Sequence, residues 1–568
     1  MRKLILGLTA LLTAFSAQVQ ALPDRVGDFA LLDTEGEFHQ FSRYRFQDAL
    51  VLMAFDSACS SNQQALTQFR QAAAGLADSP VSFALIEAGT ETDIEAIRQA
   101  RSAAGLELPL LIDDGQLVSQ TLGLSRSGEI VVLDPDRLSV LYRGPVGSQS
   151  ADVLAAEFAG TAEDTVVVPA VDGCTLDYPE QQLHMAEVPD YGTEVAPIIV
   201  EQCASCHREG GIGPFAMDSH LMLQGWSPMI REVLLTKRMP PTQVDPTIGH
   251  FDNARYISPA DMQKLVHWID AGAPRGTHPV DPLTEVEHVD MKSWRLGEPD
   301  YIVDAPTHEI PATGVLDYIN VNIPLQFDED KWVRAVQYIP GDEAVLHHLL
   351  TYVTPPTGNF EGGEADTSGV ARRFLEGYAP GKVDPIEFPE NTGVRIPAGY
   401  QLSLQFHYTT NGRATTDQTK LGLYVYDEPP AHENFTRSVA SMFIIPPHER
   451  DHEVEASYTF DEDVVVTGLR AHMHFRGKDM QFFAEYPDGR MEQLLNVPNY
   501  SYAWQPTYQL SDPARLPAGT KVHVTGSFDN SQYNPANPDP GKRLTFGLQS
   551  WDEMFIGYWT YHADSGGE

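Results

Sequence analysis

The stretch Asp463-Val-Val-Val-Thr-Gly-Leu-Arg-Ala-His472 is a short run rich in β-branched residues, which predicts a β-strand. Gly399-Tyr-Gln-Leu-Ser-Leu-Gln-Phe-His-Tyr408 predicts another, because apolar and polar residues alternate along it. From about Trp294 onward, comparable segments are divided by turns of Pro, Gly and Asn. The C-terminal half is therefore expected to fold as β-sandwiches.

Histidines occur in pairs on these predicted strands. Alternation puts His472 and His474 on one face of their strand, as chelation of one metal ion requires. His347 and His348 are neighbours in the chain and point to opposite faces of a regular strand, so a bend or a bulge is needed for both to reach one ion.

Two further side chains, His407 and Met554, extend this set. Imidazole suits copper in either oxidation state, whereas a soft thioether favours Cu(I). A lone histidine is more often an ordinary core or surface residue, and one His-x-His pair is only a modest signal. The combination could supply two separate copper sites.

Upstream lies Cys203-Ala-Ser-Cys206-His207, whose spacing fixes haem c through two thioether bonds and an axial histidine nitrogen. Met239, in Lys237-Arg-Met-Pro-Pro241, is the candidate sixth ligand of the iron, and its soft sulfur suits electron transfer. The rival methionines, which are expected to be core residues, are Met217, Met222 and Met229. The alternatives are a chance thioredoxin-like pair or half of a zinc site, for which only His220 lies near.

The haem motif and its methionine resemble those of class I cytochromes c, which implies an all-α domain over residues 190–285. Within it, the segment from Ser258 to Gly272 has an N-cap serine, a proline in the first turn and a terminal glycine. These signals predict the helix that closes the domain.

Residues 22–162 show buried-strand runs, at 49–55, 81–86 and 129–134, that alternate with helical stretches, an α/β pattern. In Phe55-Asp-Ser-Ala-Cys59-Ser-Ser-Asn62, a cysteine precedes the helical segment Gln63 to Ala74, whose N-terminus would lower the thiol pKa. The segment resembles the thioredoxin and peroxiredoxin superfamily. Ser60 and Asn62 stand where those families carry a proline or a second cysteine, so a structural domain and a thiol-active one both remain open.

The chain has only four cysteines, and the haem motif uses two of them. The remaining pair, Cys59 and Cys174, could form a disulfide in an exported protein, with Cys174 as the resolving partner if the domain is thiol-active. Residues 163–189, which contain Cys174, are expected to be a linker.

The N-terminus, Met1-Arg-Lys followed by the apolar run Leu4 to Ala17, predicts a secretory signal over residues 1–21, with a signal anchor as the alternative. No later stretch approaches the roughly 20 apolar residues that span a bilayer, so a periplasmic or secreted protein is expected. The net charge of −41 repels nucleic acid and anionic membranes and attracts a basic partner such as a small cytochrome.

Four segments occur in the order and approximate spacing of the type II copper monooxygenases, the family of peptidylglycine α-hydroxylating monooxygenase and dopamine β-hydroxylase. They are Val345-Leu-His-His-Leu-Leu350, Leu404-Gln-Phe-His-Tyr-Thr-Thr-Asn-Gly412, Leu469-Arg-Ala-His-Met-His-Phe-Arg-Gly477 and Trp551-Asp-Glu-Met-Phe-Ile-Gly-Tyr558. The resemblance covers roughly residues 295 to 563. It implies two all-β, jelly-roll-like sandwich domains, at 290–432 and 433–565.

The resemblance also assigns the ligands of two copper ions. The electron-transfer copper would be held by His347, His348 and His407. The copper at which O₂ binds would be held by His472, His474 and Met554. Their neighbours Tyr408, Asp552 and Glu553 are expected to support the ligands or the fold.

By this resemblance each copper supplies one electron, one oxygen atom of O₂ hydroxylates a substrate carbon, and the other leaves as water. Family members usually draw electrons from ascorbate, but a tethered haem c offers a donor at high effective concentration, reloaded by a periplasmic reductant or cytochrome. The alternatives are an electron-transfer or copper-binding protein without hydroxylase activity, and a thiol redox protein that acts through Cys59.

The substrate contacts of the peptide-amidating enzyme are matched in part. Arg470 and Tyr558 correspond to the Arg and Tyr that bind its substrate carboxylate, but Ile556 replaces the Asn. The resemblance therefore implies a small-molecule or peptide-like organic substrate and leaves a carboxylate on it open.

Overall fold

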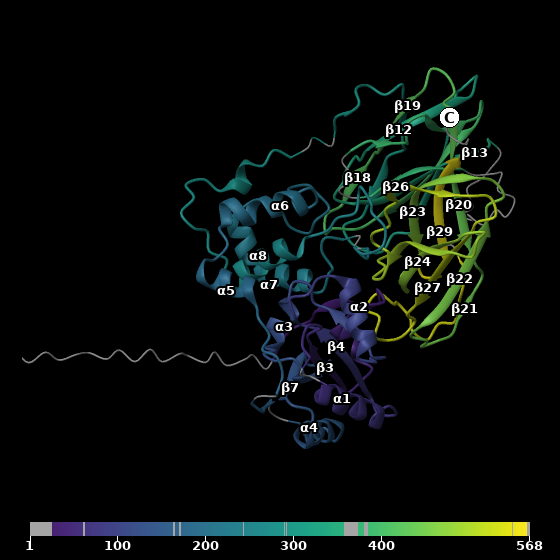
Figure 1. Ribbon diagram of the computed structural model, residues 1–568. Helices are drawn as coiled ribbons and strands as arrows, with labels where there is room; N and C mark the ends of the chain where they lie inside the picture. Colours follow the sequence, from purple (N-terminus) through teal and green to yellow (C-terminus); the bar gives the residue numbers. More distant parts are fainter. Residues whose placement is uncertain are drawn as a thin grey trace, which may run out of the picture.

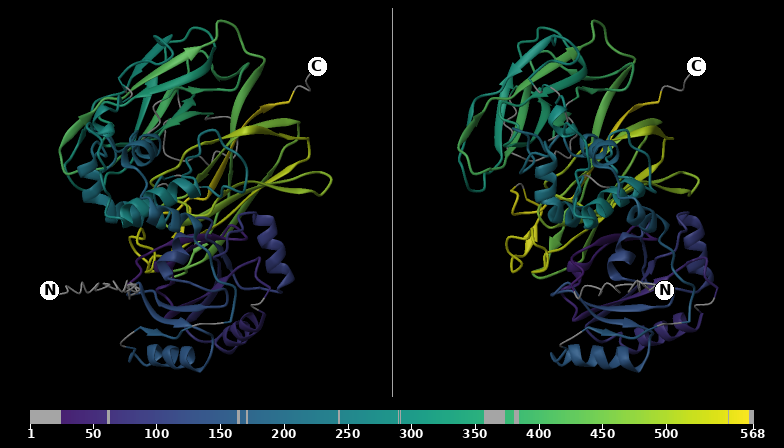
Figure 2. Two further views of the ribbon diagram at one scale, coloured as in Figure 1. Left: turned by 60° about the vertical axis from the view of Figure 1, so that its left-hand side comes forward. Right: turned by 90° about the vertical axis from the view of Figure 1, so that its left-hand side faces the viewer.

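The computed structural model describes residues 25–60, 63–162, 165–169, 172–241, 244–288, 290, 292–356, 373–379, 384–547 and 549–564. The predicted signal at 1–21 lies outside them. Three parts follow one another along the chain: an α/β unit, a group of helices and a large β region (Figure 1). The helices lie beside the α/β unit, and the β region lies against both (Figure 2).

The α/β unit is built around β3 (Ala49–Phe55), every residue of which is buried, as expected for a strand covered on both faces. β3 is parallel to β4 (Val81–Glu87) and antiparallel to β6 (Ile130–Asp134), and α1 (Gln63–Gly75) follows it. These elements confirm the strands and the helix predicted from the sequence to within one residue. The architecture is thioredoxin-like, with the sheet order β2-β1-β5-β4-β3-β6-β7-β8.

The unit's remaining elements are β1 (Ala30–Asp33), β2 (Phe38–Gln40), α2 (Ile94–Ala103), β5 (Leu110–Ile112), α3 (Leu117–Leu122), β7 (Ser139–Gly144), α4 (Ser148–Phe158) and β8 (Val166–Val167).

The helical group consists of α5 (Pro179–Ala186), α6 (Ala196–Gln202), α7 (His220–Leu235) and α8 (Pro259–Asp270). α8 is the helix predicted from its caps, and the Asp261 amide donates to Ser258 Oγ at 3.1 Å. α5 falls inside the expected linker, where proline begins a short helix that packs against α8.

The helical group shares its hydrophobic core with the α/β unit. One cluster of buried apolar side chains runs from Leu52 of β3 through Leu117 of α3 to Leu234 of α7 and Trp268 of α8. The two parts are therefore one packed body, although the sequence suggested separate domains.

The first half of the β region contains β9 (Tyr301–Asp304), β11 (Ile319–Pro324), β12 (Lys331–Ile339), β13 (Leu346–Thr354), β14 (Arg373–Tyr378), β16 (Thr392–Ile396), β17 (Gln401–Tyr408) and β19 (Lys420–Val425). The second half contains β20 (His432–Ala440), β22 (His452–Thr459), β23 (Val464–His472), β24 (Gly477–Glu485), β25 (Met491–Val497), β26 (Tyr508–Leu516), β27 (Lys521–Phe528) and β29 (Ile556–Ala563).

Each half is a sandwich with its own core. In the first, the four-stranded sheet β11-β17-β13-β14 packs on the β16-β12-β19-β9 part of a nine-stranded sheet, and in the second, β22-β27-β24-β25 packs on its β26-β23-β29-β20 part. The two parts of the long sheet join where β16 pairs in parallel with β20, at Thr392 opposite His432. The expected boundary at 432/433 thus falls on a strand that both sandwiches share.

No helix in the described part of the chain is both long and apolar enough to cross a bilayer.

Candidate metal centre

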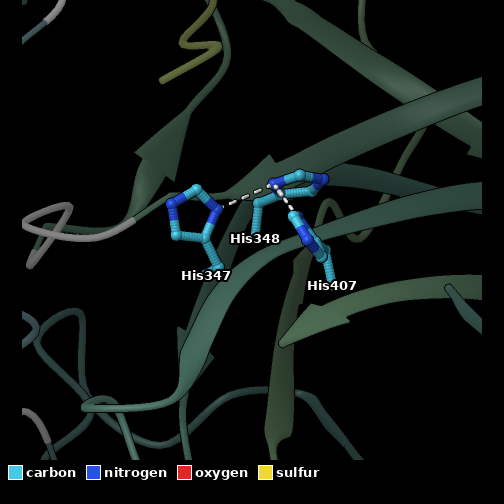
Figure 3. Close-up of side chains that lie close together, drawn as sticks. All are labelled: His347, His348 and His407. Carbon is cyan, nitrogen blue, oxygen red and sulfur yellow. Dashed lines mark hydrogen bonds between the residues drawn. The ribbon is translucent and has the colours of Figure 1, made fainter. Parts of the chain in front are cut away.

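A β-bulge brings the first three histidines together. β13 and β17 are paired with Leu346 opposite Tyr408 and His348 opposite His407, so His347 is the extra residue. The Nδ1 atom of His348 lies 3.4 Å from that of His347 and 3.3 Å from that of His407 (Figure 3). The bend or bulge that the sequence required is present at this position.

Burial keeps this first cluster uncharged. Desolvation lowers the pKa of His347 to about 4 and that of His407 to about 3, and it lowers the pKa of His348 well below 6.5. One ring nitrogen from each imidazole lies within 4.8 Å of the others. Neutral imidazoles that converge in this way fit the donor set of a copper or zinc ion.

The second cluster lies where β23 ends. His472, the last residue of β23, pairs with Ile556, the first residue of β29, and His474 and Met554 each lie two residues beyond this pair. The rings of His472 and His474 are 5.3 Å apart between centroids, and Met554 is buried. The chain thus places the predicted histidines and methionine at one end of two paired strands.

Hydrogen bonds orient both imidazoles of the second cluster. His472 Nδ1 donates to Gln505 Oε1 at 2.6 Å, and His474 Nδ1 donates to the Asp552 carbonyl at 3.2 Å. Each ring therefore keeps Nε2 for a metal, which is the usual arrangement of metal-binding histidines. Desolvation lowers the pKa of His472 to about 4 and that of His474 to about 3.

A buried ion pair between Arg476 and Glu553 lies beside the second cluster and holds its backbone. Glu553 accepts hydrogen bonds from the backbone amides of His474, at 2.9 Å, and Arg476, at 2.8 Å. Arg476 and Glu553 are both fully buried; burial raises the pKa of Glu553, and the guanidinium of Arg476 and the two amides oppose this rise and favour the carboxylate. Arg476 also donates to Asn530, which follows β27. Glu553 supports the fold, as expected, and Arg476 was not foreseen.

The haem motif follows α6. The thiols of Cys203 and Cys206 are free and partly buried. His207 Nδ1 donates to the Phe215 carbonyl at 3.0 Å, which leaves Nε2 for an axial bond to iron. These residues fit a covalent haem, and Met239, partly buried after α7, remains the predicted sixth ligand.

The three rival methionines differ in how far they are exposed to solvent. Met217 is in the core, as expected, whereas Met229 is 45% exposed, and Met222 is partly buried.

The haem motif contacts the first sandwich next to its histidines. Arg208, which follows His207, forms an ion pair with Glu343, four residues before His347. A cavity of about 590 Å³ lies between the two sites and is lined by Ser205 of the motif, by His347 and His348, and by Arg470.

Arg470 is a buried, charged side chain that lines this cavity. It is 4% exposed, and its guanidinium carbon lies 4.3 Å from the ring centroid of Phe374 and 4.2 Å from that of Tyr558. Its Nε and Nη2 atoms are buried and have no hydrogen-bond partner. A buried guanidinium without an acceptor is costly, so an anionic ligand would stabilise it.

Tyr502 is a neighbour of both clusters that the sequence did not reveal. Its ring centroid lies 5.4 Å from that of His407 and 5.7 Å from that of His474. An isolated tyrosine in a loop has no spacing or motif to mark it, so only the fold exposes this position.

Cys59 and Cys174 form the disulfide expected for an exported protein. Both interpretations of the domain allow this bond, since Cys174 was the expected resolving partner of a thiol-active Cys59. Near it, burial raises the pKa of Glu87 to about 7, and both Glu87 oxygens accept from the Ser57 amide at 3.2 Å.

No protein-family model matches the chain. Among solved structures, an uncharacterized conserved protein from Geobacillus kaustophilus is similar at 21% identity, over 28% of this chain and 91% of its own, with a TM-score of 0.24. Peroxidoxin BcpB from Mycobacterium tuberculosis is 23% identical over 24% of this chain and 95% of its own, with a TM-score of 0.21. A putative thiol:disulfide interchange protein DsbE from Chlorobium tepidum is 15% identical over 25% and 96%, with a TM-score of 0.21.

Proposed function

We propose that the protein is an exported, copper- and haem-dependent monooxygenase that hydroxylates a C–H bond of an organic substrate with O₂. The convergence of His347, His348 and His407 through a bulge is the observation that carries this proposal. A bulge that turns two adjacent side chains toward a third is expected for a ligand set and has no evident use in packing.

Copper at the two clusters would supply one-electron steps and the reductive activation of O₂. The chain's own residues hold that chemistry in place. Gln505 fixes the ring of His472, and Glu553 fixes the backbone of His474. The low pKa values of the histidines keep protons from competing with the metal at neutral pH.

Arg470 would orient the substrate. Arg470 lines a cavity large enough for a small organic molecule, and a carboxylate or another anionic group that reached its guanidinium would give it an acceptor. Tyr558 holds the guanidinium from one side, so both residues that matched the amidating enzyme lie at this point.

Haem would feed the first cluster. The ion pair of Arg208 with Glu343 fixes the haem motif against the loop that leads into β13. A donor held in this way needs no diffusional encounter with its acceptor.

The first test is to count electrons in an anaerobic titration with and without copper, and then to measure O₂-dependent hydroxylation of carboxylate-bearing candidates. Three electrons per chain with copper and one without are expected. Met554→Leu should abolish product formation, whereas Met480→Leu, a buried methionine elsewhere in the same sandwich, should not. Copper that adds no electrons would refute the proposal and favour a cytochrome fused to binding domains.

The Cys59–Cys174 disulfide favours a second candidate, a thiol redox protein, and Glu87 accepts from the amide of Ser57, two residues before Cys59. A carboxyl group that titrates near neutral pH could exchange protons during reduction of a disulfide. The double variant Cys59→Ser/Cys174→Ser separates the two functions, because a hydroxylase should keep its turnover and a thiol redox protein should not.

A further inference from the structure

One aromatic ring lies between the two histidine clusters. The ring centroid of Tyr502 is 6.3 Å from that of His348 and 5.4 Å from that of His407 in the first cluster, and 5.7 Å from that of His474 in the second. Within the part of the chain that the structure describes, no other aromatic side chain has ring contacts with both clusters. Tyr318 contacts only the first cluster, and Tyr558 only the second.

The Tyr502 ring is held rigidly. Its hydroxyl is hydrogen-bonded to that of Tyr318 and lies 2.8 Å from Ser550 Oγ, and its ring packs edge-on against Phe475. Its carbonyl accepts from Gln505 Nε2 at 2.8 Å, and Gln505 in turn accepts from His472. The loop that carries Tyr502 is thereby tied to the second cluster, while the hydroxyl is tied to the first sandwich.

Two other aromatic residues of the same loop lie next to the clusters. The Tyr500 hydroxyl accepts from the Met473 amide, between the histidines of the second cluster. The Trp504 ring lies 6.0 Å from that of His347 in the first. Within residues 500–505, Trp504 contacts the first cluster, Gln505 contacts the second, and Tyr502 contacts both.

We propose that Tyr502 is the bridging residue through which the first cluster passes an electron to the second. This inference rests on the proposed function and names a residue for one of its steps. If both clusters hold copper, a single electron would pass by way of the Tyr502 ring from the first cluster to the second, and an enediol reductant or the haem would replace it. No bond forms or breaks in Tyr502, and its ring is neither oxidised nor deprotonated.

The surroundings agree with a ring that stays neutral. Burial raises the pKa of Tyr502, so the phenol keeps its proton at neutral pH. The Tyr502 ring is buried and packs against imidazoles of both clusters, so packed side-chain atoms connect the two clusters. The ring matters for this role, whereas the hydroxyl serves only to hold it.

The experiment delivers one electron by photoreduction to the protein with cupric copper in both clusters. Freeze-quenched samples then show the rate at which the cupric EPR signal of the first cluster returns as that of the second disappears. Tyr502→Phe keeps the ring, and its rate should stay within about twofold of the original rate. Tyr502→Leu removes the ring and should slow the transfer about tenfold or more, with both EPR signals otherwise unchanged.

Two matched variants complete the design. Tyr318→Leu removes a ring of the same size that touches only the first cluster, so it should leave the rate nearly unchanged. Tyr502→Trp restores an aromatic ring and should recover the rate if Tyr502→Leu is slow. If all variants bind two coppers and Tyr502→Leu transfers as fast as Tyr502→Phe, the bridge is wrong while the proposed function stands. A protein that binds no redox-active copper overturns both.

Discussion

The histidines of both clusters are neutral in the folded protein because their burial disfavours imidazolium. The pKa of His407 falls from 6.5 to about 3 and that of His472 to about 4. As the pH drops below 6.5, the unfolded chain takes up protons that the folded chain refuses. The free energy of unfolding therefore receives the full benefit of the neutral histidines above pH 6.5. This benefit is lost progressively as the pH falls from 6.5 toward the pKa values of the folded protein.

We expect each of these histidines to cost the metal-free protein about 2 kcal/mol of stability by about pH 4.5. Denaturant unfolding of the original chain and of His407→Gln, between about pH 7.5 and 4.5, measures the difference, and the variant should lose less stability on acidification. His562→Gln, which changes a histidine outside both clusters, should follow the original chain. Parallel curves for His407→Gln and the original would contradict the prediction.

At this scale the sequence predicted the residues with motifs and missed those without. The His-x-His spacing marked His472 and His474 as neighbours, and their rings are 5.3 Å apart, although β23 ends at His472 and His474 lies beyond the strand. Arg476 and Tyr502 could not be predicted, because their roles come from pairing with Glu553 and from packing between two sandwiches. Contacts between residues far apart in the sequence leave no spacing to recognise.

Among the elements, the loop before β13 links the haem motif to the first histidine cluster. Arg208 and Glu343 are 11% and 17% exposed, so their ion pair is largely shielded from solvent. Removing either charge leaves the other poorly paired and should weaken the contact. We expect Arg208→Glu and Glu343→Arg each to slow the oxidation of reduced haem by cupric copper about tenfold, and the double exchange to restore most of the rate.

Stopped-flow absorbance of the haem band measures this rate, while ascorbate-driven turnover reports whether copper still functions. Slowed haem oxidation with intact ascorbate turnover identifies the ion pair as the docking contact. Equal losses with both donors in the single variants would instead mean that the substitutions disturb the first sandwich, and haem would need another route.

The elements themselves were largely predictable, but their association was not. The runs at Ala49–Phe55 and Val464–His472 became β3 and β23 because apolar patterning and length are local signals. The parallel pairing of Thr392 with His432, which fuses two expected domains into one sheet, depends on which edges meet in space. The sequence of either strand does not encode that partner.

For the whole molecule, the shared core has the largest consequence. The helical group that carries the haem motif buries Leu234 and Trp268 against apolar side chains of the α/β unit, such as Leu52 and Leu117. Exposing that face would cost about 25 cal/mol for each Å² of apolar surface. A helical group separated from the α/β unit therefore lacks part of its driving force for folding.

We expect a fragment of residues 190–285 to show no cooperative thermal unfolding, and a fragment of residues 25–285 to show one transition. Circular dichroism on heating measures both, and the pyridine haemochrome spectrum after export with a haem-attachment system shows which fragment acquires haem. The longer fragment is the matched control, because it contains the same haem motif together with the surface that completes the core. A cooperative transition in the shorter fragment would show that the helices fold by themselves. The α/β unit would then have to act through its disulfide or through its contacts with the β region. One such contact is the hydrogen bond that the Asn496 side chain donates to the Gly36 carbonyl.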